Sequence, residues 1–346
     1  MRKSGSDGWR GLTRRACAAA LLAAPAAVVA GTAARAADIT PAVVYSIGEK
    51  FDGSFNEAAY RGAERFKTET KINYRDFVVS NETQFEQAHR RFAQGGSDPI
   101  VGVGFLQTSA VTTIAKQFPK VRFTVIDTVV DLPNVRSVLF KEHEGSFLVG
   151  VAAALSSKTG KIGFVGGMDI PLIRKFVCGY EQGARWAKPG TTVIQNMTGN
   201  TPAAWTDPGR GGELAKGQFE RGADVIFAAA GTTGLGVLQA AKDRGKLGIG
   251  VDSNQNYLHP GTMLTSMVKR VDLAAYNSLE AAKAGNWQGG ITVLGLKEGG
   301  IDWAYDQYNE KLITPEMKAK VDQAKADIIA GKINVADYMA NNECKY

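Results

Sequence analysis

Short hydrophobic runs rich in β-branched residues alternate with amphipathic segments along most of the chain. The runs have the length and composition of buried strands, whereas the segments between them repeat apolar positions at helical spacing. Strands that alternate with helices predict an α/β fold in which parallel sheets carry helices on both faces. The predicted strands are AVVYSI (42–47), PIVGVGF (99–105), VRFTVID (121–127), KIGFVGG (161–167), TVIQNMTG (192–199), DVIFAAAG (224–231), LGIGVD (247–252) and GITVLGL (290–296).

The loops that follow these strands are the most distinctive part of the pattern. They are rich in Gly, Asp, Ser and Thr, as in GGMD (166–169), GTTG (231–234) and DSNQ (252–255). Because the carboxyl ends of parallel strands lie along one edge of a sheet, we expect these loops on the same side. The chain of 346 residues exceeds what one hydrophobic core usually organises. We therefore expect two lobes with a small-molecule site in the cleft between them.

The N-terminal residues have the pattern of a secretory signal peptide. Basic residues precede the apolar run ACAAALLAAPAAVVAG, which ends at the small-x-small site ARA (34–36). The run is short for a membrane span and is interrupted by Pro25. We expect residues 1–36 to be removed and the mature protein to be soluble and periplasmic. The pair RR (14–15) leaves the Sec and twin-arginine routes both open.

Removal of this segment changes the charge of the chain. The segment holds six Lys or Arg and one Asp, so 35 basic and 33 acidic residues remain and the net charge falls from +7 to +2. The basic composition therefore belongs mostly to targeting, and it favours neither a nucleic acid nor an anionic membrane as a partner.

Two cysteines, Cys178 and Cys344, follow the predicted signal peptide. An oxidising compartment favours a disulfide between the tail and the body of the protein. The alternative is one buried thiol and one exposed thiol in the tail. The sequence leaves both open because it does not give the separation of the two Cα atoms.

Catalytic motifs are absent from the sequence. The three histidines are far apart and lack metal-ligand spacing, and none of HExxH, CxxC or GxSxG occurs. His89 falls in the charged stretch EQAHRR and is expected to be solvated. The run GTTGLG (231–236) lacks the Lys-Ser/Thr pair of a phosphate loop and predicts a tight strand-to-helix turn. We expect no catalytic residues, metal or cofactor, and the class that fits best is a solute-binding protein.

Five residues at the predicted cleft suggest what is bound: Phe55, Asp127, Trp205, Asp252 and Lys269. Each has a structural alternative, since an aromatic near a turn can plug a core, an Asp can cap a helix and a Lys can lie on the surface. In combination, carboxylates suit the hydroxyl groups of a ligand, and a pair of aromatic rings suits a flat ring. A ligand that is flat at one end and hydroxylated at the other is a nucleoside.

A series of motifs through most of the chain is similar to a known family. In order they are SFNEAAYRG, GVGF, IDT, GMDIPLIRKFVCGYEQG, DPGRGGELA, AAAGTTGLGV, GVDSNQ and LTSMVKRVD. The chain resembles the basic membrane protein family of receptors for ABC transporters, whose characterised members bind purine nucleosides. The resemblance implies a type I periplasmic-binding fold with two lobes joined by three crossovers. It also implies an ABC permease in the inner membrane as partner, and we expect a monomer.

The resemblance assigns roles to residues at the base end of the ligand. Phe55 matches the family's base-stacking phenylalanine, and Asn56 is its neighbour in the SFN motif. Trp205 falls where a second aromatic covers the other face of the base. Ser46 stands where members of the family can carry an aspartate that reads the base edge. A hydroxyl both donates and accepts, whereas a carboxylate only accepts, so the preferred purine stays open.

The resemblance also assigns roles at the sugar end. Asp127 matches an aspartate that binds the ribose, and Gly231 matches a backbone turn against the sugar. Asp252 and Lys269 match the pair that takes the ribose hydroxyls. Other ligands remain open, among them a sugar or a free base, as does a nucleoside-cleaving enzyme or a sensory rather than a transport role.

The expected division follows the three crossovers. The first lobe should comprise residues 37–148 and about 253–290, and the second lobe and tail should comprise 149–252 and about 291–346. Hinges are expected near 145–150, 252–256 and 285–295.

Overall fold

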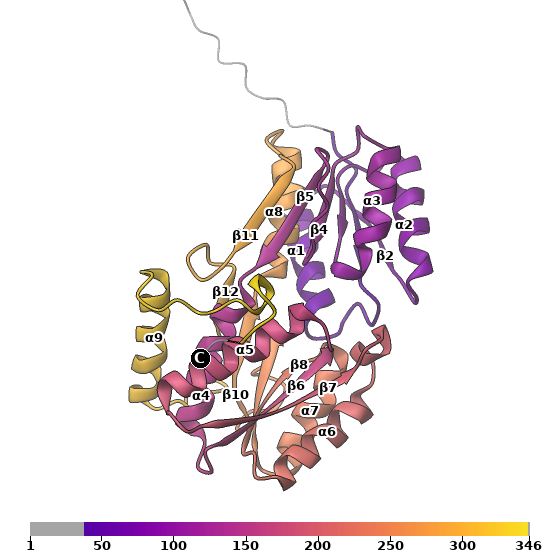
Figure 1. The fold of residues 1–346 in the computed structure, drawn as a ribbon. Helices are drawn as coiled ribbons and strands as arrows, with labels where there is room; N and C mark the ends of the chain where they lie inside the picture. Colours follow the sequence, from indigo (N-terminus) through magenta and orange to yellow (C-terminus); the bar gives the residue numbers. More distant parts are fainter. Residues whose placement is uncertain (1–37, 345–346) are drawn as a thin grey trace, which may run out of the picture. The chain divides into compact units, whose positions relative to one another are not determined.

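The computed structural model describes residues 38–344, whose arrangement Figure 1 shows. The predicted signal peptide, residues 1–36, lies outside the described residues. The described strands form two six-stranded sheets, each of which forms a lobe with its own helices. The predicted α/β class is therefore confirmed.

The first sheet is parallel throughout and has the strand order β11-β5-β4-β3-β1-β2. Helices α1 and α8 cover one face of it, and α2 and α3 cover the other (Figure 1). The strands are β1 (Ala42–Tyr45), β2 (Arg75–Val78), β3 (Ile100–Gly102), β4 (Phe123–Ile126), β5 (Val135–Phe140) and β11 (Gly290–Leu294). The helices are α1 (Phe55–Thr70), α2 (Thr83–Gln94), α3 (Thr108–Gln117) and α8 (Val271–Lys283).

The second sheet has the order β12-β10-β9-β8-β6-β7, in which only β12 pairs antiparallel. Helices α4 and α5 cover one face, α6 and α7 cover the other, and α9 packs outside α4 (Figure 1). The strands are β6 (Lys161–Met168), β7 (Thr192–Gly199), β8 (Val225–Ala229), β9 (Leu247–Asp252), β10 (Met263–Lys269) and β12 (Ile301–Trp303). The helices are α4 (Glu142–Ser156), α5 (Pro171–Ala187), α6 (Pro208–Glu220), α7 (Thr232–Asp243) and α9 (Pro315–Ile329).

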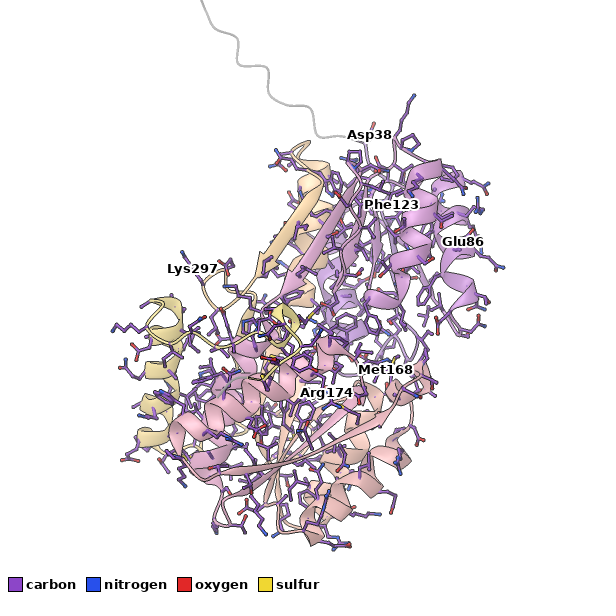
Figure 2. The ribbon with its side chains drawn as sticks, in the orientation of Figure 1. Asp38, Glu86, Phe123, Met168, Arg174 and Lys297 are labelled. Carbon is purple, nitrogen blue, oxygen red and sulfur yellow. A yellow bond between two sulfur atoms is a disulfide. The ribbon has the colours of Figure 1, made fainter. Side chains whose placement is uncertain are left out.

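The cores follow from the hydrophobic pattern. Strands β1, β3 and β4 are buried along their whole length, as expected for parallel strands with helices on both faces. Figure 2 shows Phe123 of β4 inside the first lobe, while Glu86 projects from the outer face of α2. His89 is fully buried, with Nε2 2.6 Å from Oε1 of Gln107, so the expectation of a solvated side chain is wrong. It shares the apolar face of α2 with buried residues at helical spacing, namely Phe85, Ala88 and Phe92.

The chain crosses between the lobes at different positions from those predicted. The crossings follow Phe140, follow Lys269 and lie between Leu294 and Ile301. Strand β10 pairs with β9 in the second sheet, and β11 pairs with β5 in the first. The boundaries expected near 148, 253 and 290 are therefore displaced. The second boundary is displaced because residues 263–269 form an additional strand of the second sheet before the chain returns.

Helices α4 and α5 approach each other closely because glycines lie at their contact. A Cβ atom at Gly150 would meet the carbonyl oxygen of Tyr180 at 2.1 Å, and one at Gly183 would meet that of Phe147 at 2.0 Å. Gly179 faces the backbone of His143 in the same way. This contact fixes the start of α4, which follows the first crossover, against the middle of α5.

Cys178 and Cys344 form a disulfide, with their Cα atoms 5.5 Å apart. The sequence left this pairing open against two separate thiols. Cys178 is buried on α5, and the bond joins it to the tail 166 residues later.

Candidate ligand-binding site

A pocket lies where strand-end loops of both sheets meet. It encloses about 680 Å³, including the part open to solvent. The structure brings together every site residue that the sequence predicted. Those lining the pocket are Ser46, Phe55, Asn56, Asp127, Trp205, Gly231, Asp252 and Lys269.

Asn56 supports the loop that follows β1. Its Oδ1 accepts a hydrogen bond from the backbone N–H of Ser46 at 3.0 Å. Its Nδ2 donates to the carbonyl oxygens of Ser46 and Glu49 at 3.2 and 3.1 Å. Both ends of the amide are therefore engaged by the loop, and Asn56 shapes the pocket wall where Ser46 lies.

Asp52 supports the same wall from the start of α1, and sequence reasoning missed it. Its carboxylate accepts hydrogen bonds from the backbone N–H groups of Ser54, Asn56 and Glu57 at 2.8, 3.0 and 3.1 Å. These groups belong to the first turn of α1, where backbone donors lack partners within the helix. An Asp just before SFN is a capping signal that could have been read from the sequence.

The aromatic end of the pocket consists of Phe55, Phe105 and Trp205. Phe55 begins α1 and packs on Gly104, where an added Cβ would lie 3.4 Å from its ring. Phe105 follows β3 and meets Trp205 edge to face, with ring centroids 6.5 Å apart. An aromatic from α1 and another from the loop before α6 therefore face one cavity.

Trp205 packs against the backbone of two glycines, Gly167 and Gly231. A Cβ at Gly167, near the end of β6, would come within 2.1 Å of the indole ring. Gly231 lies on the same side, with φ +54° at the turn into α7, as predicted for GTTGLG. The loop that carries Trp205 ends at Asp207, whose side chain caps α6 by accepting from the backbone N–H of Arg210 at 2.8 Å. Pro208 follows at the first position of α6.

The charged end of the pocket consists of Asp127, Asp252 and Lys269, with Glu142 behind Lys269. Lys269 Nζ donates to Oδ2 of Asp127 at 2.7 Å and forms an ion pair with Oε1 of Glu142 at 2.9 Å. The other carboxylate oxygen of Asp127, Oδ1, is buried and has no hydrogen-bond partner among residues 38–344. Buried acceptors are nearly always satisfied, so a donor from outside the described residues is the expected partner.

Asp252 ends β9 and is held by a residue of the first lobe. Its Oδ2 accepts from the hydroxyl of Ser54 at 2.8 Å. The hydroxyl of Ser253 in turn donates to the carbonyl oxygen of Ser54 at 2.8 Å, and Gln255 Nε2 donates to that of Gly53 at 3.1 Å. The loop after β9 is therefore attached to the start of α1 at the pocket.

Both strand-end aspartates have a left-handed backbone, with φ +69° at Asp127 and +62° at Asp252. This conformation is uncommon for residues other than glycine, and Asp tolerates it better than most. Residues held in such conformations cluster at binding and catalytic sites. The two carboxylates thus share an unusual backbone geometry as well as a pocket.

The charges at this end perturb one another. Burial raises the pKa of Asp252 to about 6, against the opposing effect of Lys269. Burial also raises the pKa of Asp127, again against Lys269. Burial opposes the charge of Lys269, but the carboxylates of Asp127 and Glu142 outweigh it and raise its pKa. Lys269 therefore stays charged, whereas the two aspartates titrate nearer neutrality than usual.

The family of PnrA-like ABC transporter substrate-binding proteins matches residues 39–338. The chain belongs to this family. The basic membrane protein resemblance is thereby confirmed, and the protein is a substrate-binding protein of an ABC transporter. This function implies a small-molecule ligand and a permease partner.

Relatives of this substrate-binding protein agree with that assignment. It is 32% identical to the ABC transporter nucleoside-binding protein BmpA of Lactococcus lactis, over 86% of this chain and 89% of the relative. It is also 32% identical to a CD4+ T-cell-stimulating antigen of Listeria monocytogenes, over 87% and 88% of the two chains. A solved ABC transporter solute-binding protein from Aeropyrum pernix has a TM-score of 0.79 at 29% identity, covering 86% of this chain and 93% of that one. The fold is that of periplasmic binding proteins.

Several residues that line the pocket were not predicted as site residues. Leu172, Ile173 and Phe176 lie at the start of α5, where their apolar character suggested only a core. Glu142 was missed because it begins a helix and nothing in its spacing places it beside Lys269. Among residues 38–344, no group of three His, Cys, Asp or Glu side chains could hold a metal ion, and no helix is long and apolar enough to cross a bilayer.

Proposed function

We propose that this substrate-binding protein captures a purine nucleoside and delivers it to an ABC permease. The observation that carries the proposal is that one pocket has an aromatic end and a charged end. Phe55 and Trp205 line it together with Asp127, Asp252 and Lys269. A sugar alone has no flat ring for the aromatic end, and a free base has no hydroxyls for the charged end.

The base lies between Phe55 and Trp205 in this proposal. Stacking of a base on an aromatic side chain contributes about 1–3 kcal/mol. Ser46 lines the pocket and reads the edge of the base. Its neutral hydroxyl is compatible with both donors and acceptors on the purine, so inosine, guanosine and adenosine are all candidate ligands.

The ribose lies at the charged end. Its hydroxyls donate to Oδ1 of Asp127, which lacks a partner, and to the carboxylate of Asp252. Lys269 donates to a ribose oxygen while it remains paired with Asp127. Charge-assisted hydrogen bonds of this kind contribute about 1.5–3 kcal/mol each. The buried acids also disfavour a 5′-phosphate, so a nucleotide should bind more weakly than its nucleoside.

Transport follows from contacts made by both lobes. Asp127 and Phe55 come from the first lobe, and Asp252 and Trp205 come from the second. A ligand that contacts both lobes favours the closed arrangement over an open one. The permease then recognises the closed, loaded protein at the periplasmic face of the inner membrane, after export by the predicted signal peptide.

A panel of ligands tests the proposal. Isothermal titration calorimetry and thermal shift would compare inosine, adenosine and guanosine with hypoxanthine, ribose and inosine 5′-monophosphate. At least one nucleoside should bind tighter than its free base and than ribose by about a hundredfold or more. If ribose bound as tightly as the nucleosides or more tightly, the protein would be a sugar receptor. The same result for hypoxanthine would indicate a receptor for free bases. Recovery of intact inosine after incubation separates binding from cleavage.

A further inference from the structure

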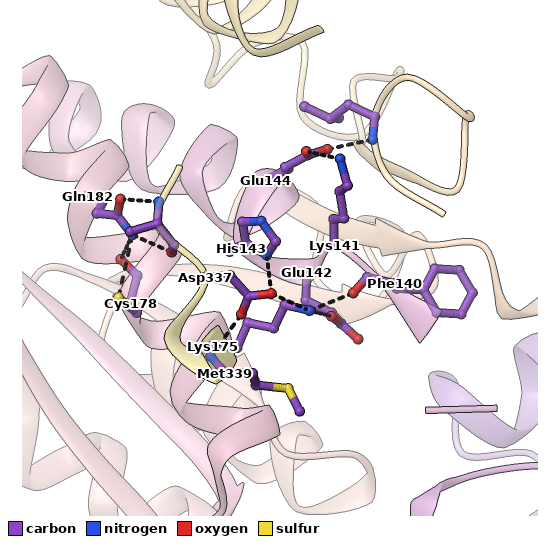
Figure 3. A network of polar contacts seen from close by, with 12 residues as sticks. Phe140, Lys141, Glu142, His143, Glu144, Lys175, Cys178, Gln182, Asp337 and Met339 are labelled. Carbon is purple, nitrogen blue, oxygen red and sulfur yellow. Dashed lines mark hydrogen bonds and ion pairs between the residues drawn. The ribbon is translucent and has the colours of Figure 1, made fainter. Parts of the chain in front are cut away.

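A series of charged groups, buried up to Lys175 and half-buried at Asp337, runs from the charged end of the pocket to the C-terminal tail. Lys269, which contacts Asp127, also pairs with Glu142. The other oxygen of Glu142, Oε2, lies 3.0 Å from Nζ of Lys175 on α5. Lys175 lies 3.4 Å from Oδ2 of Asp337 in the tail. Figure 3 shows the part of this series from Glu142 to Asp337.

The tail is held along one face of α5. Lys175, Cys178 and Gln182 lie at spacing i, i+3 and i+7, which places them on the same side of the helix. Cys178 forms the disulfide with Cys344. Gln182 accepts from the backbone N–H of Ala336 at 2.8 Å and donates to its carbonyl oxygen at 3.0 Å (Figure 3). The tail residue next to Ala336 is Asp337, so these contacts determine where its carboxylate lies.

Lys175 has an acceptor for each of its three protons. It donates to the carbonyl oxygen of Phe140 at 2.7 Å, besides its ion pairs with Glu142 and Asp337. Burial opposes its charge, but Glu142 and Asp337 outweigh this effect and raise its pKa. His143 lies 3.9 Å from Asp337, and burial together with Lys175 lowers its pKa to about 4. His143 is therefore neutral at pH 7, and Lys175 is the cation that faces Asp337.

Glu142 connects Lys175 to the pocket. Its side chain is 1% exposed, so its charge depends on partners in the protein. Burial opposes this charge, but Lys269 and Lys175 outweigh it and lower the pKa of Glu142. Without Lys175, one carboxylate oxygen would lose its cation. Glu142 would then draw the ammonium group of Lys269 away from Asp127.

We propose that Lys175, secured by the disulfide-anchored tail, is a positioning residue for ligand binding. It fixes Glu142 so that the ammonium group of Lys269 stays on Asp127 at the ribose end of the pocket. Glu142 and Lys269 lie at the first and second crossovers between the lobes. The series of ion pairs therefore fixes the backbone positions at which the polypeptide passes from one lobe to the other. The inference rests on the proposed nucleoside function and extends it to residues outside the pocket.

The test is a thermodynamic cycle in which a residue of the protein and the hydroxyl groups of the ligand are changed separately and together. Calorimetry at pH 7.5 would measure the Kd of inosine and of 2′,3′-dideoxyinosine, which lacks the 2′- and 3′-hydroxyls of the sugar. The proteins are the full chain, Lys175→Met and Lys175→Arg. Lys175→Met should weaken inosine about tenfold and leave dideoxyinosine within about twofold, because only the ribose contacts depend on Lys269. Lys175→Arg should restore inosine binding to within about threefold, since it keeps the cation.

Variants of the tail provide a second measurement. Asp337→Asn and Cys344→Ser should each weaken inosine about threefold with the same selectivity for the hydroxylated ligand. If Lys175→Met does not fold, the inosine and dideoxyinosine affinities of these two variants test the proposal in its place. The matched control is Asp322→Asn, which breaks the surface pair between Asp322 and Lys318 on α9 and should change neither Kd.

The outcomes are distinct. Equal losses for inosine and dideoxyinosine in the Lys175 and tail variants would mean a general structural role and would overturn the proposal. Inosine affinity that is unchanged in all of them would overturn it too. If the unmodified protein binds none of the three nucleosides, the proposed function fails first, and the inference fails with it.

Discussion

The aromatic end of the pocket and its charged end differ in what lies behind the side chains that face the ligand. Phe55 and Trp205 lie on glycine backbone, at Gly104 for the first ring and at Gly167 and Gly231 for the second. These are van der Waals contacts, which fix where a ring lies. The ammonium group of Lys269 also lies 5.2 Å from the centroid of the Phe55 ring, so Phe55 contacts the charged end as well. A change at Trp205 should therefore remove contact area and little else.

At the charged end, each group is held by another charge or by a hydrogen bond. Lys269 is held by Asp127 and Glu142, and Asp252 by the hydroxyl of Ser54. Because these groups are buried, the loss of one leaves its partner without compensation. We therefore expect the largest losses of affinity from single changes at the charged end, and effects that depend on pH only there.

Asp252→Asn should have the largest effect. The substitution keeps the shape of the side chain and an oxygen that can accept from Ser54, so the protein should fold normally. A ribose hydroxyl that donated to the carboxylate would then face the amide N–H2 group, which donates and cannot accept, and the loss should be on the order of a hundredfold in inosine affinity. Calorimetry measures the Kd and thermal unfolding checks the fold. A Kd within threefold of the original would remove Asp252 from the site.

Trp205→Ala should have the next largest effect, a loss of about ten- to a hundredfold, because one stacking partner of the base disappears. Trp205→Phe should retain most of the affinity. Gly167→Ala tests the same end by addition, because its Cβ would come within 2.1 Å of the indole and force the ring to move. Both Trp205→Ala and Gly167→Ala should weaken hypoxanthine as well as inosine. Loss for inosine alone would contradict the placement of the base.

The pH dependence of binding should originate at the charged end. The pKa of Asp252, about 6 in the folded protein, lies above the usual value near 4 of an aspartate. This raised pKa stabilises the ligand-free fold at low pH, and the contribution is lost as the pH rises from about 4 through 6. Ligand binding has the opposite sign, because ribose hydroxyls need the ionised carboxylate. Inosine affinity should therefore fall about tenfold between pH 7 and pH 5 for each carboxylate that protonates.

Asp252→Asn separates this effect from other titrations. The variant lacks the carboxylate, so its affinity should depend less on pH than that of the original protein over the same interval. Trp205→Ala should keep the original dependence while binding more weakly throughout. A variant lacking Asp252 with an unchanged pH profile would show that other groups control it.

The sequence was sufficient to predict the pocket but not what supports it. Gly231, Asp127 and Asp252 follow buried strands, and parallel strands place their carboxyl ends together whatever the details of the helices. Phe55 and Trp205 were selected as aromatic residues in loops of the predicted cleft, and the resemblance to a known family assigned them to the two faces of the base. Local pattern and topology were thus enough for these residues, but they did not reveal other residues that line the pocket, namely Asp52, Phe105, Leu172, Ile173 and Phe176.

The residues behind the pocket depend on packing between distant segments. Glu142 meets Lys175 because glycines let α4 and α5 approach closely, and Asp337 meets Lys175 because a disulfide closes a separation of 166 residues. The second crossover was misplaced for a similar reason. Residues 263–269 contain Thr265, Ser266 and Lys269 among apolar residues, and their pairing with β9 decides that they form a strand. Contacts between segments that lie far apart in the chain cannot be predicted from a short stretch of sequence.

Substitution of Ser46 should change the inosine affinity least, but it tests most directly which purine base the pocket prefers. Ser46→Ala removes one neutral hydrogen bond, worth about 0.5–1.5 kcal/mol, and should weaken inosine about two- to tenfold. Ser46→Asp replaces a group that donates and accepts with one that only accepts. It should favour inosine and guanosine, which carry an N–H on the pyrimidine ring, over adenosine, which has an acceptor there. Calorimetry with the three nucleosides gives the ratios. If neither variant changes the ratio of inosine to adenosine affinity, Ser46 does not face the base edge, and discrimination between purines must come from the backbone around Gly104 and Phe105.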